Sequence, residues 1–376
     1  MNGGRGPWRS YPLLRPEVVV VGLGNIGLRV LWELGNNGYS VMGIDRSRAA
    51  VDRARRLGLD AKVGDATSID SLKRHISGAR VVASAVPGSL GLEVLRNLVS
   101  LGVDVVDVSF FRWHDKPVEP GRGQLVVVDA GVAPGLSNLL VAEGVRSVRG
   151  RRARIYVGGI SERPMPPLGL AITWSVEDLI EEYLRPARLI INGRMVSLDP
   201  LGVEPGRIHV DGVGELEYFP TDGLRSLLES FNWLEELAEY TLRWPGHVNA
   251  MKMLKELGFM SGEPIKADGC LVGARGFLAG VIRKKYSGLR DIVVLIVEVE
   301  GDEGYRRYSA IIGSDDSWSA MAKATGGFQA AVTRLILDGE VGLRGLVYPE
   351  DLASKEGLTP RILGMLGESG VNVTLA

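Results

Sequence analysis

The stretch Val18-Val19-Val20-Val21-Gly22-Leu23-Gly24-Asn25-Ile26-Gly27 decides the first half of the fold. Four β-branched residues lead directly into three glycines spaced G-x-G-x-x-G, and the amphipathic segment 28–34 follows. This pattern predicts a strand, a tight turn and a helix. In such a unit Gly22 permits the turn, Gly24 lets the backbone approach a pyrophosphate, and Gly27 lets the helix pack on the strand. The N-terminus of the helix then offers N–H groups to the phosphates.

An acidic residue follows at the distance that a dinucleotide site requires. A second predicted strand, 40–44, ends at Asp45, and in dinucleotide-binding folds an acid about 20 residues past the first glycine meets the adenine ribose 2′-hydroxyl. A carboxylate repels a 2′-phosphate, so Asp45 favours NAD over NADP, whereas Arg46 and Arg48 leave NADP possible. The plain alternative is a glycine turn of a parallel sheet that binds no ligand.

Strands and helices continue to alternate as far as 125–128, which is typical of an α/β fold with a doubly wound parallel sheet. The loops after the strands meet at the carboxyl edge of the sheet, where ligands bind in open α/β folds. Asp65 has the alternative of capping a predicted helix at 68–76. The residues that we expect at this edge are Asp65, Ala66, Ala85, Val86, Pro87, Asp107, Gly131 and Pro134.

Composition excludes several classes of protein. The 376 residues suit two domains, and the net charge of −1 gives no overall field to attract nucleic acid or a membrane surface. The one cysteine, Cys270, excludes a disulfide framework and a thiolate metal cluster, and it is expected to be a small buried apolar residue in a cytoplasmic protein. No metal site is expected. Residues 1–16 are expected to form a loose tail.

From about residue 154 the predicted strands come in hairpins. Segment 189–196 turns on Asn192-Gly193, and the segments 291–300 and 305–312 flank a glycine-containing turn. This pattern predicts a second, α+β domain with a mostly antiparallel sheet. A long helical stretch, 317–338, contains Ala324-Thr325-Gly326-Gly327, which should kink the helix or mark a functional approach.

Residues 240–247 carry the second group of candidate site residues. As a strand, the segment places Thr241 and Arg243 on one face, where they can hold a carboxylate. His247 then begins a helix whose dipole keeps the ring neutral, so that it can accept a proton. Alternatively, Arg243 pairs with a structural acid and His247 only caps the helix. The other, apolar face of the strand holds Tyr240, Leu242 and Trp244.

Four motifs are informative together: 22–27, 131–138, Thr173-Trp174-Ser175 with Glu177-Asp178-Leu179, and 240–247. They resemble the saccharopine dehydrogenase family, with the lysine 6-dehydrogenase branch nearest. The resemblance covers nearly all of the chain after residue 16. It implies a Rossmann domain over 17–140, an inserted substrate and dimerisation domain over 141–315, a segment 316–376 that returns to the first domain, and a homodimer. Trp244 stands where tyrosine is expected.

Enzymes of that family oxidise a C–N bond of lysine or saccharopine with NAD(P). The resemblance therefore implies oxidative deamination of the lysine side chain, with Arg243, Thr241 and Trp244 binding substrate and His247, backed by Asp129 or Tyr240, removing an amine proton. The implied cofactor site, for NAD or else NADP, comprises Gly22, Gly24, Asn25, Ile26, Gly27, Asp45, Arg46, Asp65, Ala66, Ala85, Val86, Pro87, Asp107, Gly131 and Pro134.

Two other functions remain open. A saccharopine or carboxynorspermidine dehydrogenase needs a second carboxylate site, which Arg112, Arg163 or Arg185 can supply. A non-catalytic, NAD-sensing regulatory protein is the other alternative, because residues 17–86 also look like the nucleotide-sensing domains of potassium channels and transporters. The presence of a whole further domain with Arg243 and His247 favours an enzyme over the sensor.

Overall fold

The four valines of β1 (Val18–Val21) alternate between the two covered faces of a parallel sheet. Val18 and Val20 pack on one side and Val19 and Val21 on the other, and all four are fully buried. The computed structural model describes residues 15–111 and 118–376, and this sheet has the order β17-β6-β5-β4-β1-β2-β3. Its other strands are β2 (Val41–Asp45), β3 (Ala61–Val63), β4 (Val81–Ser84), β5 (Asp104–Asp107), β6 (Leu125–Val127) and β17 (Gly345–Val347).

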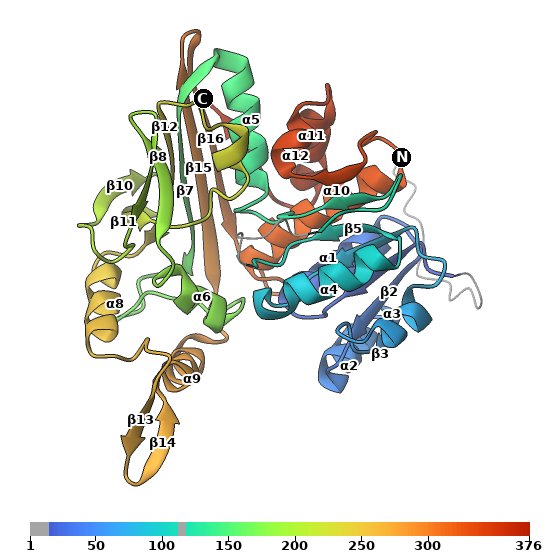
Figure 1. The fold of residues 1–376 in the computed structure, drawn as a ribbon, viewed down its shortest axis with the longest axis horizontal. Coiled ribbons are helices and arrows are strands. Elements are labelled where there is room, and N and C mark those ends of the chain that lie inside the picture. Colours follow the sequence, from blue (N-terminus) through green and yellow to red (C-terminus); the bar gives the residue numbers. More distant parts are fainter. Residues whose placement is uncertain (1–14, 112–117) are drawn as a thin grey trace.

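Helices cover both faces of this first sheet, as expected for a doubly wound fold (Figure 1). Strand β17 comes from the C-terminal part of the chain and pairs in parallel with β6. One face is covered by α1 (Asn25–Asn36), α2 (Arg48–Arg56) and α10 (Gly327–Leu337), and the other by α3 (Ile69–Ile76) and α4 (Gly88–Ser100). Two more helices, α11 (Pro349–Ala353) and α12 (Leu358–Glu368), pack beside α10.

The second sheet has the order β10-β11-β12-β7-β15-β16-β18, with β8 and β9 beside β12. Its pairings are antiparallel except that of β7 with β12, so the prediction of a mostly antiparallel sheet is confirmed. Its strands are β7 (Gly150–Ser161), β8 (Ala187–Ile191), β9 (Arg194–Leu198), β10 (Gly206–Val210), β11 (Gly214–Pro220), β12 (Glu236–Arg243), β15 (Asp291–Gly301), β16 (Gly304–Gly313) and β18 (Thr374–Leu375).

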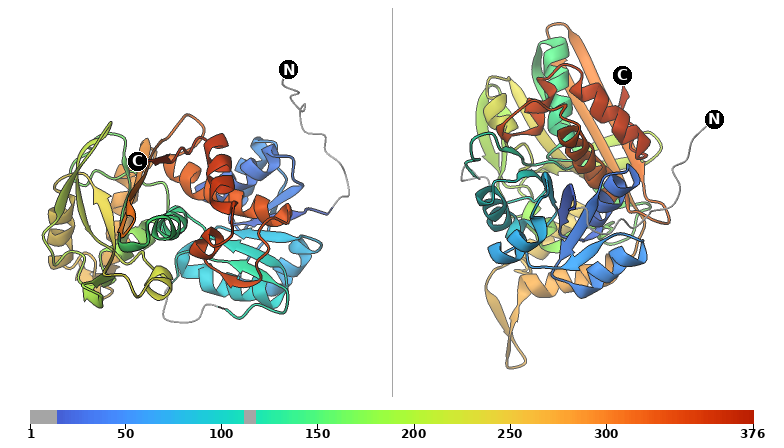
Figure 2. Two further views of the ribbon diagram at one scale, coloured as in Figure 1. Left: turned by 90° about the horizontal axis from the view of Figure 1, so that it is seen from above. Right: turned by 90° about the vertical axis from the view of Figure 1, so that its right-hand side faces the viewer.

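Helix α5 (Leu136–Val148) packs on this second sheet, and the view from above shows the two domains side by side (Figure 2). Helices α6 (Val176–Glu182), α8 (His247–Glu256) and α9 (Ala274–Tyr286) form a separate apolar cluster, and α7 (Leu227–Ser230) is short. The hairpin of β13 (Pro264–Ala267) and β14 (Cys270–Gly273) projects beyond both domains (Figure 1). Cys270 lies on this hairpin and is exposed, so the expectation that it is buried was wrong.

Two local predictions are confirmed with their backbone geometry. Asn192 and Gly193 have φ angles of 51° and 70°, as a two-residue hairpin turn between β8 and β9 requires. The long C-terminal helix is interrupted by a π-helical segment, Ala322–Gly326, at the predicted position. Residues 1–14 of the expected tail lie outside the described residues, as do Arg112, Trp113 and His114. No helix within 15–111 and 118–376 has the length and apolar character needed to cross a membrane.

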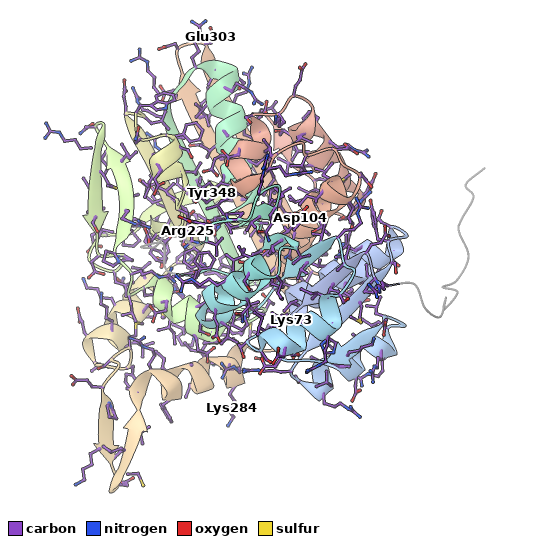
Figure 3. All side chains as sticks on the ribbon, turned by 45° about the vertical axis from the view of Figure 1, so that its right-hand side comes forward. Lys73, Asp104, Arg225, Lys284, Glu303 and Tyr348 are labelled. Carbon is purple, nitrogen blue, oxygen red and sulfur yellow. The ribbon has the colours of Figure 1, made fainter. Side chains whose placement is uncertain are left out.

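A buried ion pair joins the two domains. Asp129 follows β6 of the first sheet, and its carboxylate accepts hydrogen bonds from Arg225 Nε at 3.0 Å and Nη2 at 2.8 Å. Both residues are at most 1% exposed, and Arg225 also donates to the Phe111 carbonyl oxygen. Arg225 is labelled in Figure 3. Asp129 is therefore part of the domain junction, and the expectation that it supports a catalytic base is not met.

Replacing Arg225 by Ala should lower the free energy of unfolding by about 3–5 kcal/mol, because it leaves a buried carboxylate unpaired. The measurement is the midpoint of denaturant or thermal unfolding. Arg207→Ala is the matched control, since Arg207 pairs with Glu215 on the surface, where their side chains are 67% and 57% exposed. Equal shifts for the two variants would show that the junction pair is not stabilising.

Candidate active site between the two domains

A cavity of about 1040 Å³ lies between the domains. Its first wall is the glycine turn together with the loops after β2, β3 and β4, and its second wall comes from β7, β12 and α6. Most residues predicted from the sequence to bind a cofactor line it, namely Gly22, Gly24, Asn25, Ile26, Asp45, Arg46, Asp65, Ala66, Ala85, Val86, Pro87, Gly131 and Pro134. The structure thus brings together residues that are more than 100 positions apart in the chain.

The glycine turn has room for a phosphate group. A Cβ at Gly24 would meet no atom within 4 Å, so the backbone there faces open space. Gly22 has a φ of 86°, and a Cβ at Gly27 would come within 1.8 Å of the Gly22 carbonyl oxygen. Gly27 therefore lies behind the turn rather than in the cavity wall. The first helical bond of α1 runs from the Leu28 N–H to the Gly24 carbonyl oxygen, so the N–H groups of residues 24–27 have no helical acceptor and can face a ligand.

Asp45 lies at the end of β2, where the sequence placed it. Its carboxylate accepts the Leu23 N–H at 2.6 Å and the Ser47 N–H at 2.7 Å, so it also fixes the turn. Arg46 lines the same part of the cavity, as does Arg53, which donates to the Leu23 carbonyl oxygen at 3.0 Å. The Asp45 carboxylate therefore lies near two guanidinium groups at this end of the cavity.

Asp65 lines the cavity, but it is not the cap of the next helix. Its carboxylate accepts hydrogen bonds from the backbone and hydroxyl of Thr67, at 2.9 and 2.8 Å, and these bonds lower its pKa. Ser68 is the residue that caps α3. Asp65 was expected either to lie at the ligand edge of the sheet or to cap the next helix, and the structure shows the first.

The predicted alternation along β12 is confirmed. Thr241 and Arg243 both line the cavity, whereas Tyr240, Leu242 and Trp244 belong to an apolar cluster on the other face. Arg243 is 2% exposed and its Nη2 donates to Glu182 at 2.8 Å. Trp244 does not line the cavity. Its indole N–H donates to the Ser161 carbonyl oxygen at 3.0 Å. The expected contact of Trp244 with substrate is thus not supported.

Two carboxylates of α6 that the sequence analysis did not select, Asp178 and Glu182, face the cavity. Burial raises the pKa of both, and the charge of Arg243 opposes this effect at Glu182. Ser175 caps the helix by accepting the Asp178 N–H at 3.1 Å. The i, i+4 spacing after this cap, which places both carboxylates on one helix face, is the sequence signal that could have identified them.

Arg185 is a cation of the cavity wall that pairs with no acid among residues 15–111 and 118–376. Among the described residues no carboxylate oxygen lies within 4 Å of its nitrogens, and its guanidinium lies 4.3 Å from the centre of the Phe110 ring. Burial lowers its pKa. An arginine with this environment can bind the carboxylate of a ligand without first giving up a protein partner.

His247 does not reach the cavity. The ring is 1% exposed, with Nε2 2.7 Å from the Tyr183 hydroxyl and Nδ1 2.6 Å from the Leu168 carbonyl oxygen. Burial lowers its pKa to about 3, and the nearby charge of Arg243 acts in the same direction. Since both ring nitrogens are engaged with the protein, the expectation that His247 takes a proton from substrate has no support here.

Two other candidates lie outside the cavity wall. Tyr240 stacks against Tyr156 at 5.3 Å between ring centres, on the apolar face of the sheet. Asp107 is fully buried and accepts the Ser109 hydroxyl hydrogen bond at 2.5 Å, and burial raises its pKa to about 7. Both residues support the fold around the cavity, so neither is retained as a group that contacts cofactor or substrate.

Two hydrogen bonds connect the domains across the cavity. The Asn25 side chain donates to the Thr173 carbonyl oxygen at 3.0 Å, and the Gly88 N–H donates to Asp178 at 3.3 Å. The glycine turn and the loop after β4 are therefore tied directly to the start of α6. In the described part of the chain, no group of three or more His, Cys, Asp or Glu side chains is arranged to hold a metal ion.

The fold and the cavity define a two-domain protein of the Rossmann class whose ligand site lies between the domains. Comparison with protein families agrees: the saccharopine dehydrogenase C-terminal domain matches residues 131–371, and the TrkA-N domain matches residues 18–106. The chain belongs to the saccharopine dehydrogenase family.

Individual relatives are distant. Rat mitochondrial alpha-aminoadipic semialdehyde synthase is 24% identical over 276 residues, which cover 67% of this chain but 29% of that protein. The bovine protein of the same name is 23% identical and covers 53% of this chain and 23% of its own length. The chain thus spans less than a third of these relatives. Apo saccharopine dehydrogenase (L-Glu forming) from Saccharomyces cerevisiae has the same fold, with a TM-score of 0.78, 18% identity and coverage of 96% and 99%.

The burial of His247 generates a prediction about pH. Its pKa is about 3 in the folded protein and about 6.5 when unfolded, so unfolding takes up a proton below pH 6.5. Stability from this group is complete above pH 6.5 and is lost as the pH falls toward 3. Between pH 7 and pH 5 the loss should be about 2 kcal/mol. Urea unfolding should show a correspondingly weaker pH dependence for His247→Asn, and identical pH dependences would contradict the assignment.

Proposed function

We propose that this protein is an NAD(P)-dependent dehydrogenase that oxidises a C–N bond of an amino acid, with oxidative deamination of the lysine side chain as the specific reaction. The observation that carries the proposal is one cavity lined both by the glycine turn and by Arg185, Arg243, Asp178 and Glu182. Such a cavity can hold a dinucleotide and a zwitterionic substrate next to each other.

The dinucleotide would lie along the first wall of the cavity. The open space at Gly24 suits a pyrophosphate on the N-terminus of α1, and Asp45 suits the adenine ribose. Val86 and Pro87, in the loop after β4, would border the nicotinamide. When bound, the cofactor supplies a hydride acceptor. Asp45 supports NAD, while the neighbouring guanidinium of Arg46 keeps NADP as the alternative.

The second wall would orient the substrate through its charges. Arg185, which pairs with no described acid, is the more available ligand for the α-carboxylate, and Arg243 lies in the same wall but is already paired with Glu182. The carboxylates of Asp178 and Glu182 would attract the ammonium end of the substrate. This division into a cationic and an anionic part fits an amino acid with a charged side-chain amine.

The reaction also needs a group that accepts a proton. A hydride can leave the carbon only after the neighbouring nitrogen has lost its extra proton, because a protonated amine has no lone pair to donate. Since His247 does not reach the cavity, the acceptor has to be another group, and carboxyl groups are the other acids and bases near this wall.

Two alternatives have specific support. Oxidation of saccharopine is favoured by the presence of Arg185 and Arg243 in one wall, which could hold two carboxylates, and by the fold shared with yeast saccharopine dehydrogenase. A sensor that binds the dinucleotide without chemistry is favoured by the match of residues 18–106 to the TrkA-N domain. Under the sensor hypothesis, the paired charges of Arg243 and Glu182 would be structural only.

One experiment separates these functions. The purified full-length protein is mixed with NAD or NADP and with lysine, saccharopine or carboxynorspermidine, and reduced cofactor is followed by absorbance. Reduction that is fastest with lysine and NAD supports the proposal, whereas a preference for saccharopine supports the first alternative. Tight dinucleotide binding without reduction by any of these compounds would support the sensor and contradict the dehydrogenase.

Replacing Arg185 by Gln should raise the KM for the amino acid about tenfold or more while leaving the dinucleotide Kd unchanged, since a hydrogen bond to a charged group contributes roughly 1.5–3 kcal/mol. Steady-state kinetics and cofactor titration measure the two effects. Arg275→Gln is the control, because Arg275 pairs with Glu181 of α6 at 2.6 Å without lining the cavity. An unchanged KM in Arg185→Gln would remove this residue from the substrate site.

A cytoplasmic homodimer is part of the proposal. The projecting hairpin and α9 expose apolar side chains, including Ile265, Leu271 and Phe277 at 48%, 74% and 56%, which would suit contact with a second copy.

A further inference from the structure

The face of β12 that lines the cavity continues to a third polar residue. Side chains at i, i+2 and i+4 of a strand share a face, so Glu239 stands in one row with Thr241 and Arg243. Unlike those two residues, Glu239 does not line the cavity. It is 4% exposed, and no lysine or arginine nitrogen among the described residues lies within 4 Å of its carboxyl group.

Two threonine hydroxyls connect this carboxyl group to the cavity. The Thr221 hydroxyl donates to Glu239 Oε1 at 3.3 Å, and the Oγ1 atoms of Thr221 and Thr241 are 2.8 Å apart. Thr241 lines the cavity, while Thr221 and Thr241 are only 3% and 5% exposed. The row therefore runs from the cavity through two buried hydroxyls to a buried acid. Among the described residues, the second carboxyl oxygen of Glu239, Oε2, has no hydrogen-bond partner.

We propose that Glu239 stores the proton that leaves the substrate amine, and that Thr241 and Thr221 relay it. This inference rests on the proposed dehydrogenase function. When Glu239 is ionised it can only accept, so the Thr221 hydrogen points to it and the Thr241 hydrogen points to Thr221. Thr241 then offers a lone pair to the cavity.

Each O–H bond that breaks in this relay is replaced by another. The substrate N–H bond breaks as Thr241 gains a hydrogen, Thr241 passes its own hydrogen to Thr221, and Thr221 passes its hydrogen to the carboxylate. The amine nitrogen keeps the electron pair, and Glu239 becomes a neutral acid. After the hydride has left, water from the solvent adds to the resulting iminium carbon. The same steps in reverse then return the proton from Glu239 to the cavity as the C–N bond breaks and ammonia leaves.

The surroundings of Glu239 suit a group that gains and loses a proton. Burial raises its pKa to about 8, and the negative charges of Glu182 and Asp222 act in the same direction. Each of those two acids lies beside an arginine, Glu182 at 2.8 Å from Arg243 and Asp222 at 2.7 Å from Arg188. A proton acceptor is most effective when its pKa lies near the operating pH.

Gly223 keeps the niche that holds the carboxyl group. A Cβ at this position would lie 1.8 Å from Glu239 Oε1, so any larger residue would displace the acid from Thr221. The backbone adds a further constraint, because the Thr221 N–H donates to the Glu239 carbonyl oxygen at 3.2 Å. The acid and the first hydroxyl are thus held at a fixed separation.

The test compares pH profiles of kcat/KM for lysine. For the wild type, kcat/KM should rise with pH through about 8, since Glu239 must be ionised to accept. Glu239→Gln and Thr221→Val keep the side-chain shape but break the relay, so they should lose this rise and fall about 100-fold or more at high pH. Thr221→Ser retains a hydroxyl and should retain the rise.

Glu350→Gln is the matched control. Glu350 is also a buried acid, with a pKa raised to about 7 by burial, but it bonds to Ser230 and does not line the cavity. Its replacement should leave the pH profile unchanged. Wild-type profiles in Glu239→Gln and Thr221→Val, or the same loss in Glu350→Gln, would overturn the relay.

A second readout does not require activity. The carbonyl stretch of a protonated carboxyl group, followed by difference infrared spectroscopy from about pH 6 to about pH 10, should contain a titrating band that Glu239→Gln removes. If the wild type oxidises no amino acid but shows this band, the proposed function fails while Glu239 remains a titrating group. Absence of a band that depends on Glu239 would overturn the relay in an active enzyme as well.

Discussion

The alternation of side chains along β12 is the constraint on which the candidate site depends. A strand directs every second residue to the same face, and β12 lies between β7 and β11, so its two faces cannot exchange roles without a shift of register. One face packs into an apolar cluster through Leu242 and Trp244. The other face presents Arg243 and Thr241 to the cavity. Packing of the apolar face therefore holds the polar face in position.

The buried charges at the domain junction and those at the cavity differ in how fully they are paired. At the domain junction Asp129 and Arg225 satisfy each other through two hydrogen bonds, and such a pair fixes one arrangement of the domains. At the cavity the charges of the described residues are only partly matched: Arg243 pairs with Glu182, while Arg185 lies against the Phe110 ring. An incompletely matched set of buried charges costs free energy unless a ligand completes it, so the cavity favours a charged ligand.

Local sequence patterns predicted the fold well because they act over a few residues. The valines of β1, the glycine spacing after it and the Asn192-Gly193 turn each have one dominant backbone conformation, and all three occur as predicted. The pairing of β17 with β6 brings residues far apart in the chain into one sheet, and no local pattern specifies it. The prediction that Cys270 is buried was wrong for a related reason. Exposure depends on whether an element packs against the rest of the protein, and β14 projects away from it.

By itself the sequence determined the glycine turn, Asp45 at the end of the next strand, and the shared face of Thr241 and Arg243. Each follows from the geometry of a single strand or turn. Only the tertiary structure decided that His247 is enclosed between Tyr183 and Leu168, and that Asp178 and Glu182 of α6 face the cavity instead. The physical reason is that a histidine at a helix N-terminus has the same local pattern whether it faces solvent, ligand or core. The packing of α8 against α6 and α9 determines that His247 faces the core.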